Sequence, residues 1–341
     1  MESSPRLARV AAAPPGAPAA GRAQDGGGGA SRGAIEHHYD VGADFYRLWL
    51  DRRMVYSCAW PEGPDGSLWS TGPDGDGLGD DGLGDDEAGR DLEAAQTAKL
   101  AWHAVASGGA GARRVLDVGC GWGSLMGYLV DEAGTAHVTG LTLSRDQAAV
   151  VAALGDPRIE VRLEDWRDHR PDTAYDAIVS IGAFEHFARH DLSDAARAGV
   201  YRGFFERAAR WLPAGGRLSL QTIAYDDYQA GAGPVSSFFA EDIFPESGLP
   251  YLGDVVAASD PWWRTVALRA DPAHYSWTLA RWQGRLEANR DRAVELVGRE
   301  TYRRYLRYLR VSRAMFDRRV ATLYRVVLER RARPRMSGAG R

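Results

Sequence analysis

Short apolar segments, separated by amphipathic stretches, run through the middle of the chain. Five of them have the length and pattern of strands, and they lie near residues 114–118, 137–141, 159–163, 175–181 and 217–223. Apolar residues recur at helical spacing between most of these segments. The alternation predicts an α/β protein with a Rossmann-like, mostly parallel sheet and helices on both faces. Ligands of such sheets bind outside the carboxyl ends of the strands.

Further periodic patterns flank this central region. Residues 45–50 predict an amphipathic helix, and helical spacing of apolar residues begins again at Asp91. Farther along the chain, residues 263–268 fit a sixth strand, whereas 275–288 and 300–330 have helical patterns. We expect helices to form a cover over the active site.

Composition separates one folded domain from stretches that lack a core-forming pattern. Residues 1–33 are rich in Ala, Pro and Gly and predict a disordered tail, and 331–341 predict a frayed basic tail. The domain between them spans 34–330 and contains a Gly- and Asp-rich insertion at 61–90. Regular calcium repeats and EF-hand spacing are missing from this insertion. We therefore expect a solvated acidic loop and no metal site.

Overall composition is that of an ordinary soluble globular protein. Apolar residues make up 45% and charged residues 26% of the 341 residues, and the net charge is −4. We expect no nucleic-acid partner, because this charge gives no basic footprint. No apolar run reaches the roughly 18 residues of a membrane span, and the N-terminus lacks a signal peptide's apolar core. Two cysteines fit a reducing cytoplasm. We attribute the presence of a single lysine, Lys99, to base composition rather than to function.

A glycine-rich turn follows the first predicted strand of the sheet. Asp117 ends this strand, Gly119, Gly121 and Gly123 follow, and a helix is predicted to open near Ser124. Glycine adopts positive φ angles without strain and lets a ligand approach the backbone closely. The free N–H groups of the helix N-terminus face whatever anion occupies the turn. The strand, turn and helix together predict a nucleotide or nucleoside site.

The glycine spacing narrows the choice of nucleotide. Dinucleotide-binding turns have Gly-x-Gly-x-x-Gly, and triphosphate-binding loops have Gly-Lys-Ser or Gly-Lys-Thr; residues 117–123 match neither. The pattern Asp-x-Gly-x-Gly-x-Gly resembles the first motif of class I S-adenosylmethionine (SAM) methyltransferases. That resemblance implies that the turn holds the amino-acid end of SAM.

An ordered set of motifs makes the resemblance more specific. The chain resembles the family of cyclopropane-fatty-acid synthases and mycolic acid cyclopropane synthases from residue 36 to about residue 318. The insertion at 61–90 has no counterpart in the family pattern. The motifs are His38-Tyr39-Asp40, Tyr56-Ser57-Cys58-Ala59, Ala95-Gln96-x-x-Lys99, residues 116–123, Gly140-Leu141-Thr142-Leu143-Ser144-x-x-Gln147, residues 180–187, Ile243-Phe244-Pro245, His274-Tyr275 and Thr278-Leu279-x-x-Trp282.

The resemblance implies a set of SAM-binding residues. The glycine turn and a Tyr-Ser pair are implied to bind the methionine end of SAM. Residues after the second strand are implied to bind its ribose, and residues after the third strand its adenine. Trp166 has an alternative role in core packing. The implied residues are Tyr56, Ser57, Asp117, Gly119, Gly121, Thr142, Gln147, Asp165 and Trp166.

The resemblance also implies a bicarbonate ion that acts as general base beside the SAM methyl group. Its matching ligands are the backbones of Cys58 and Ile181 and the side chains of Glu185 and Tyr275. The family's remaining ligand is a histidine, where this chain has Gln221. Glutamine can donate a hydrogen bond but does not titrate near neutrality. Glu185 could alternatively be a helix-start acid, and we expect a structural role for His186 next to it.

Three functions are compatible with these residues. The first is C-methylation of an alkene in an unsaturated acyl chain or lipid, with a cyclopropane or methyl-branched product. The second is methylation of a small metabolite without bicarbonate, and the third is a non-catalytic SAM-binding scaffold. Retention of Glu185, Tyr275 and the SAM residues argues against the scaffold. An acyl substrate allows peripheral membrane contact, and the sequence leaves the oligomeric state open.

Overall fold

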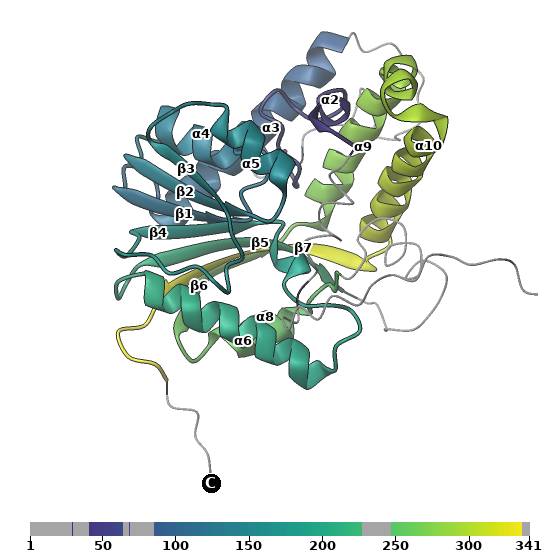
Figure 1. The fold of residues 1–341 in the computed structure, drawn as a ribbon. Helices are drawn as coiled ribbons and strands as arrows, with labels where there is room; N and C mark the ends of the chain where they lie inside the picture. The colour runs from purple at the N-terminus through teal and green to yellow at the C-terminus, as the bar shows by residue number, and fades with distance from the viewer. Residues whose placement is uncertain (1–28, 30–40, 64–67, 69–84, 227–246, 336–341) are drawn as a thin grey trace, which may run out of the picture.

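The structure is a computed structural model, and it describes Gly29, residues 41–63, Leu68, and residues 85–226 and 247–335 (Figure 1). Most of the tail predicted at 1–33, most of the acidic insertion and part of the C-terminal tail therefore lie outside the described residues. The motifs His38-Tyr39-Asp40 and Ile243-Phe244-Pro245 lie outside them as well.

A seven-stranded sheet forms the centre of the molecule, in the order β3-β2-β1-β4-β5-β7-β6. Strands β1 to β5 are parallel, whereas β7 runs antiparallel to both of its neighbours, β5 and β6. The central strands are buried on both faces, as expected for a sheet covered by helices on both sides. The strands are β1 (Arg114–Val118), β2 (His137–Thr142), β3 (Ile159–Leu163), β4 (Ala177–Ile181), β5 (Arg217–Tyr225), β6 (Trp263–Ala270) and β7 (Ala321–Arg330).

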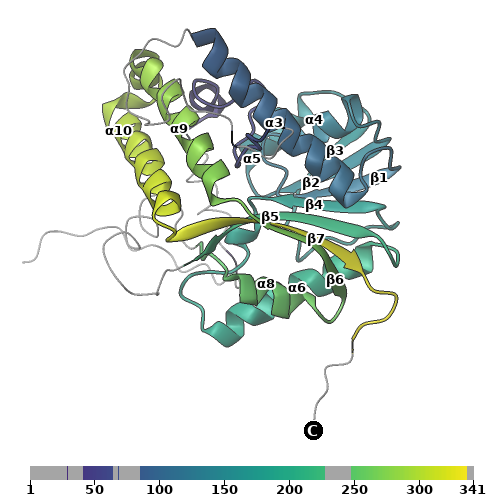
Figure 2. The same cartoon turned by 180° about the vertical axis from the view of Figure 1, so that it is seen from behind.

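Helices cover both faces of the sheet (Figures 1 and 2). One face carries α3 (Asp85–Ser107), α4 (Ser124–Asp131) and α5 (Arg145–Ala152), and the other carries α6 (Asp194–Trp211) and α8 (Leu252–Ser259). Serine side chains cap α5 and α6, where Ser144 accepts from the Gln147 amide and Ser193 from the Ala196 amide. The five predicted strands, the sixth strand and the predicted fold class are confirmed.

A third group of helices lies at the carboxyl ends of the parallel strands. It contains α2 (Ala43–Tyr46), α9 (Pro272–Ala288) and α10 (Arg290–Asp317), and Figure 1 shows the lower ends of α9 and α10 near the start of β7. Buried aromatic rings fill the space between them and the sheet, among them Trp49, Trp282, Tyr305 and Phe316. These helices form the expected cover. Among the described residues, no helix combines the length and apolarity that crossing a membrane requires.

Three sequence predictions of helix boundaries are wrong. The helix predicted over 300–330 ends at Asp317, and residues 321–330 form β7 instead. Arg319, at a positive φ of 56°, turns the chain between the two elements. The helix expected to start at Asp91 begins at Asp85, inside the predicted acidic loop. The helix expected over 45–50 ends at Tyr46, and a hydrogen-bonded turn continues from it.

Candidate active site

The glycine turn after β1 has the backbone geometry that the sequence predicts. Gly119, Gly121 and Gly123 have φ angles of 84°, 54° and 82°, a region that favours glycine. The amides of Gly119 and Cys120 both donate to the Leu141 carbonyl, which ties the turn to the end of β2. A Cβ atom on Gly119 would lie 2.2 Å from the Ala183 Cβ, so no other residue fits there.

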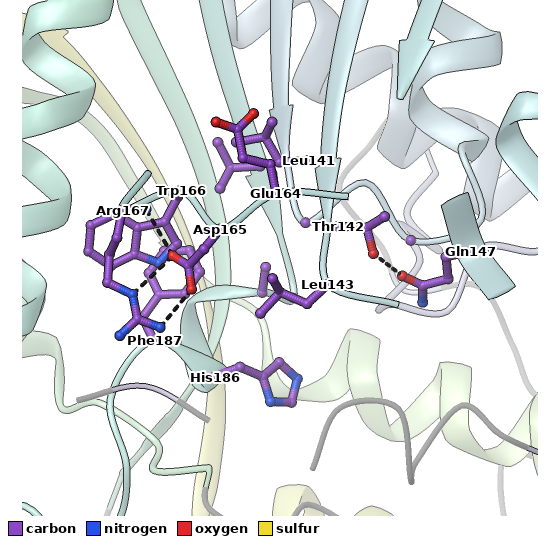
Figure 3. Close-up of a pocket in the computed structure, with 15 residues that line it drawn as sticks. Leu141, Thr142, Leu143, Gln147, Glu164, Asp165, Trp166, Arg167, His186 and Phe187 are labelled. Carbon is purple, nitrogen blue, oxygen red and sulfur yellow. Dashed lines mark hydrogen bonds and ion pairs between the residues drawn. The ribbon is translucent and has the colours of Figure 1, made fainter. Parts of the chain in front are cut away.

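A pocket opens at the carboxyl ends of β1 to β4, next to this turn (Figure 3). Its polar side chains come from the end of β2, from α5, and from the segments that follow β3 and β4. The Thr142 hydroxyl donates to Gln147 Oε1 at 2.7 Å, so the two predicted ribose-binding side chains are already oriented by each other. The lining residues are Val118, Gly119, Gly121, Leu141, Thr142, Leu143, Gln147, Glu164, Asp165, Trp166, Arg167, Gly182, Ala183, His186 and Phe187.

Asp165 and Trp166 line the same pocket, but both also serve the surrounding structure. Arg167 binds the Asp165 carboxylate through Nε at 2.9 Å and Nη2 at 2.7 Å. Trp166 packs against Phe187 and Phe204 and is 7% exposed. Trp166 thus packs in the core, as the alternative role proposes, and it also lines the pocket. Its role in binding adenine remains a prediction.

A second pocket lies on the other side of the glycine turn. It shares Gly119, Gly121, Gln147 and Gly182 with the first, so the two form one elongated site across the strand ends. Its remaining lining residues are Met54, Val55, Tyr56, Ser57, Lys99, Leu100, Asp117, Cys120, Trp122, Ser124, Leu125 and Ile181. The predicted residues Tyr56, Ser57 and Asp117 are therefore brought together with the turn.

Two buried charges of opposite sign lie in this second pocket. Lys99 Nζ donates to the Ser57 hydroxyl at 2.8 Å. Burial lowers the pKa of Lys99 to about 7, and burial raises the pKa of Asp117 to about 7. Each group partly stabilises the charge of the other. A ligand with one carboxylate and one ammonium group would complement this pair.

Glu185 lies one turn beyond β4, in the 3₁₀ helix η1 (Phe184–His186). Its Oε1 accepts a hydrogen bond from the Ile223 amide of β5 at 2.6 Å, while Oε2 is buried without a partner among the described residues. Burial raises the pKa of this carboxyl to about 7, although hydrogen bonds oppose the rise. Glu185 can therefore exchange a proton near neutral pH.

Gln221, Cys58 and Ile181 meet where the end of β4 pairs with the middle of β5. Ile181 and Gln221 are register partners, and Gln221 Nε2 donates to the Cys58 carbonyl at 3.4 Å. Burial raises the pKa of the Cys58 thiol to about 11, so the sulfur stays protonated and non-nucleophilic. The structure thus brings these three predicted residues into contact.

Tyr275 belongs to the helical cover rather than to the sheet. Its ring stacks on Phe316 of α10 with centroids 4.5 Å apart, and it lies in the same apolar cluster as Cys58. Four further polar residues lie around the site, namely Lys99, His103, His186 and Arg325. The sequence analysis named Lys99 only within a motif, expected a structural role for His186, and missed His103 and Arg325. Lys99 was detectable, because it closes the motif Ala95-Gln96-x-x-Lys99.

One group of side chains among the described residues has the spacing of metal ligands. Ligand atoms of Glu62, Asp271 and His274 lie within 4.8 Å of one another. However, Arg269 binds both carboxylates, and Arg325 binds Asp271 and approaches His274 Nδ1 at 3.0 Å. Two guanidinium groups thus already neutralise the cluster.

Comparison with known proteins identifies the family. The family model described as mycolic acid cyclopropane synthetase matches residues 30–326. Cyclopropane mycolic acid synthase 2 of Mycobacterium bovis is 35% identical over 301 residues, which cover 83% of this chain and 89% of that protein. Cyclopropane mycolic acid synthase 3 of Mycobacterium tuberculosis is 32% identical over 314 residues, or 87% and 97% of the two chains.

A solved structure agrees with these matches. The mycolic acid cyclopropane synthase CmaA1, complexed with SAH and CTAB, superposes with a TM-score of 0.70 at 30% identity, over 88% of this chain and 99% of that one. The glycine turn, the elongated pocket and the motifs on which the resemblance depends lie within the matched region. The chain therefore belongs to the mycolic acid cyclopropane synthase family of SAM-dependent methyltransferases.

Proposed function

We propose that this protein transfers the methyl group of SAM to an alkene carbon of an unsaturated acyl chain or lipid and forms a cyclopropane or methyl-branched product. One observation supports this function above the others. Glu185 directly precedes His186, which lines the elongated pocket, and it is a buried carboxyl with a pKa of about 7 whose Oε2 has no partner among the described residues.

The residues of the elongated pocket fit SAM. Lys99 and Asp117 complement the carboxylate and ammonium groups of its methionine end, and Thr142 and Gln147 can bond a ribose. A Cβ at Gly119 would collide with the side chain of Ala183, which also lines the pocket, so this position must stay without a side chain. When bound, SAM supplies an electrophilic methyl group on a sulfonium.

The protein's own groups provide positioning and an apolar enclosure for a weak alkene nucleophile. Rings of Tyr56, Trp282 and Tyr275 lie in or against the buried cluster under the helical cover. Aromatic faces can stabilise positive charge that develops on the substrate after methyl transfer. Removal of a proton from the new methyl then decides between cyclopropane and branched products.

The groups near Gln221 fit a bicarbonate ion as the proton acceptor. The Gln221 amide donates, and Glu185 can donate or accept because its pKa is near neutrality. The carbonyl of Cys58 lies beside the same amide. We therefore include bicarbonate in the proposed site, held by Cys58, Ile181, Glu185, Gln221 and Tyr275.

The experiment is incubation with SAM and a panel of unsaturated phospholipids, free fatty acids and small metabolites. Mass spectrometry detects the added carbon, and proton NMR distinguishes upfield ring protons from vinylic or methyl signals. We expect a methylated lipid whose formation responds to added bicarbonate and is lost in Glu185→Gln. Methylation of a small metabolite only, without a bicarbonate response, would contradict the proposal.

A further inference from the structure

Gln221 is flanked by a buried arginine on the neighbouring strand. Arg325 of β7 is its direct partner in the antiparallel register of β5 and β7, so both side chains lie on the same face of the sheet. Arg325 is fully buried, and its Nε donates to Gln221 Oε1 at 2.9 Å. Its other nitrogens donate to Asp271 at 2.5 Å and to the Ala59 carbonyl at 2.8 Å.

These contacts determine which way the carboxamide of Gln221 points. A guanidinium donates hydrogen bonds and never accepts them, so the amide oxygen must face Arg325. The ring of His103 lies 3.4 Å from the same oxygen, and its other nitrogen lies 2.8 Å from the Ser219 hydroxyl. The Gln221 amino group therefore faces the opposite direction, toward the Cys58 carbonyl.

We propose that Arg325 is a positioning residue that fixes the Gln221 carboxamide with its amino group toward Cys58 and the reacting centre, so that this position always presents a hydrogen-bond donor and never a titrating base. This inference rests on the proposed function only in identifying the reacting centre. The orientation itself follows from the contacts of Gln221 and Arg325.

The surroundings of Gln221 would also determine the protonation state of a histidine at this position. The charged or titratable neighbours are Arg325 from β7, His103 and Lys99 from α3, Cys58 from the segment before α3, and Glu185 from η1. Behind Arg325 lie His274 of α9 and Asp271, which directly precedes α9. An imidazole placed there would have to accept from Arg325. It would therefore stay neutral and donate its single N–H toward the site, as glutamine does.

The first test follows the imidazole of Gln221→His by NMR in isotopically labelled protein, without substrate. We expect the additional resonance to show no protonation between about pH 5.5 and pH 8, the range in which an ordinary histidine titrates. In Gln221→His/Arg325→Met it should titrate, with a pKa at least about one unit higher. An imidazole that titrates normally with Arg325 still present would overturn the proposal.

The matched control is Gln221→His/Arg269→Met. Like Arg325, Arg269 binds Asp271 and lies over the ring of Trp60. Unlike Arg325, it has no described contact with Gln221. The imidazole should remain neutral in this variant. In the Arg325 variant, Arg269 still forms an ion pair with Asp271, so that carboxylate is not left without a partner. Thermal unfolding verifies that both variants fold.

A second test applies even if the Arg325 variant does not fold. Gln221→Glu keeps a partner for Arg325 but removes the N–H donor, so we expect kcat to fall roughly 100-fold while KM for SAM changes less than about threefold. Gln221→His keeps the donor and should lose no more than about tenfold. Wild-type kcat in Gln221→Glu would overturn the proposal. Absence of any methylated lipid with the wild type would instead refute the proposed function and leave the NMR result intact.

Discussion

Glu185 is a carboxyl group that the fold removes from water and provides with only part of its hydrogen bonds. Because burial favours its neutral form, its pKa rises from 4.5 to about 7 in the folded protein. The folded state therefore binds more protons than the unfolded state between these two values. Glu185 contributes stability below pH 4.5, and that contribution is lost as pH rises to about 7.

Replacing this carboxyl with an amide should change how the stability of the protein depends on pH. Wild-type stability should fall by as much as about 3 kcal/mol more than that of Glu185→Gln between pH 4.5 and pH 7. Urea unfolding across this range measures the difference, and the raised pKa values of Asp51 and Asp117 cancel because both proteins retain them. Parallel stability curves for the two proteins would show that Glu185 titrates normally.

Gly119 combines a positive φ with a close neighbour, so the position has no room for a side chain. Gly119→Ala places a Cβ 2.2 Å from Ala183 and should weaken SAM binding by at least about tenfold. The control is Gly111→Ala, which has a φ of 70° but open space and lines neither pocket. It should lose about 1 kcal/mol of stability with an unchanged Kd for SAM. Calorimetry that finds equal Kd values for both variants would contradict the assigned site.

Residues in the glycine turn were predictable because each follows a strand that the hydrophobic pattern marks. Gly119, Gly121 and Asp117 line the elongated pocket as expected. Lys99 was named only as the end of the motif Ala95-Gln96-x-x-Lys99 and was given no role in the site. Arg325 was not predicted, because an isolated basic residue in a sequence has no pattern that distinguishes a buried position from a solvated one. Only the folded sheet brings Arg325 beside Gln221.

At the scale of elements, β7 is the segment that the sequence analysis predicted wrongly, as part of a helix. Its apolar residues continue the spacing of α10, and neither Gly nor Pro separates the two elements. A strand buried on both faces has no alternation, so periodicity alone cannot distinguish it from a helix. The β-branched residues Thr322, Val326 and Val327 were the available signal.

The position of β7 between two strands makes it sensitive to proline. Val327 pairs with Ser219 of β5 and Ala267 of β6, so Val327→Pro should cost at least about 3 kcal/mol or prevent folding. Val266→Pro is the matched variant, because Val266 is 41% exposed at a bulge of the edge strand β6. It should cost no more than about 1 kcal/mol by thermal unfolding. Equal losses would argue against the observed strand order.

At the scale of the whole molecule, a residue near the start of the acidic insertion is paired with the folded domain. Glu62 accepts hydrogen bonds from Arg269 at 2.6 Å and contacts His274 at 3.1 Å. We predict that deletion of residues 69–84 leaves SAM affinity and turnover within about threefold. Glu62→Gln should instead lower the unfolding temperature, since it removes a partner from Arg269. Loss of turnover in the deletion variant with SAM binding intact would assign those residues a role in substrate handling.

The strand order also has a consequence for how the protein is made. Chains emerge from the ribosome starting at the N-terminus, and β7 is synthesised after every other strand of the sheet. Until it emerges, β6 lacks β7 as its pairing partner, and the edge of β5 has an open row of backbone groups. Gln221 is by then already in the nascent chain, but without the guanidinium that orients it. The reacting centre is therefore completed only after β7 has been synthesised, and a chain arrested before residue 321 would contain the glycine turn without an oriented Gln221.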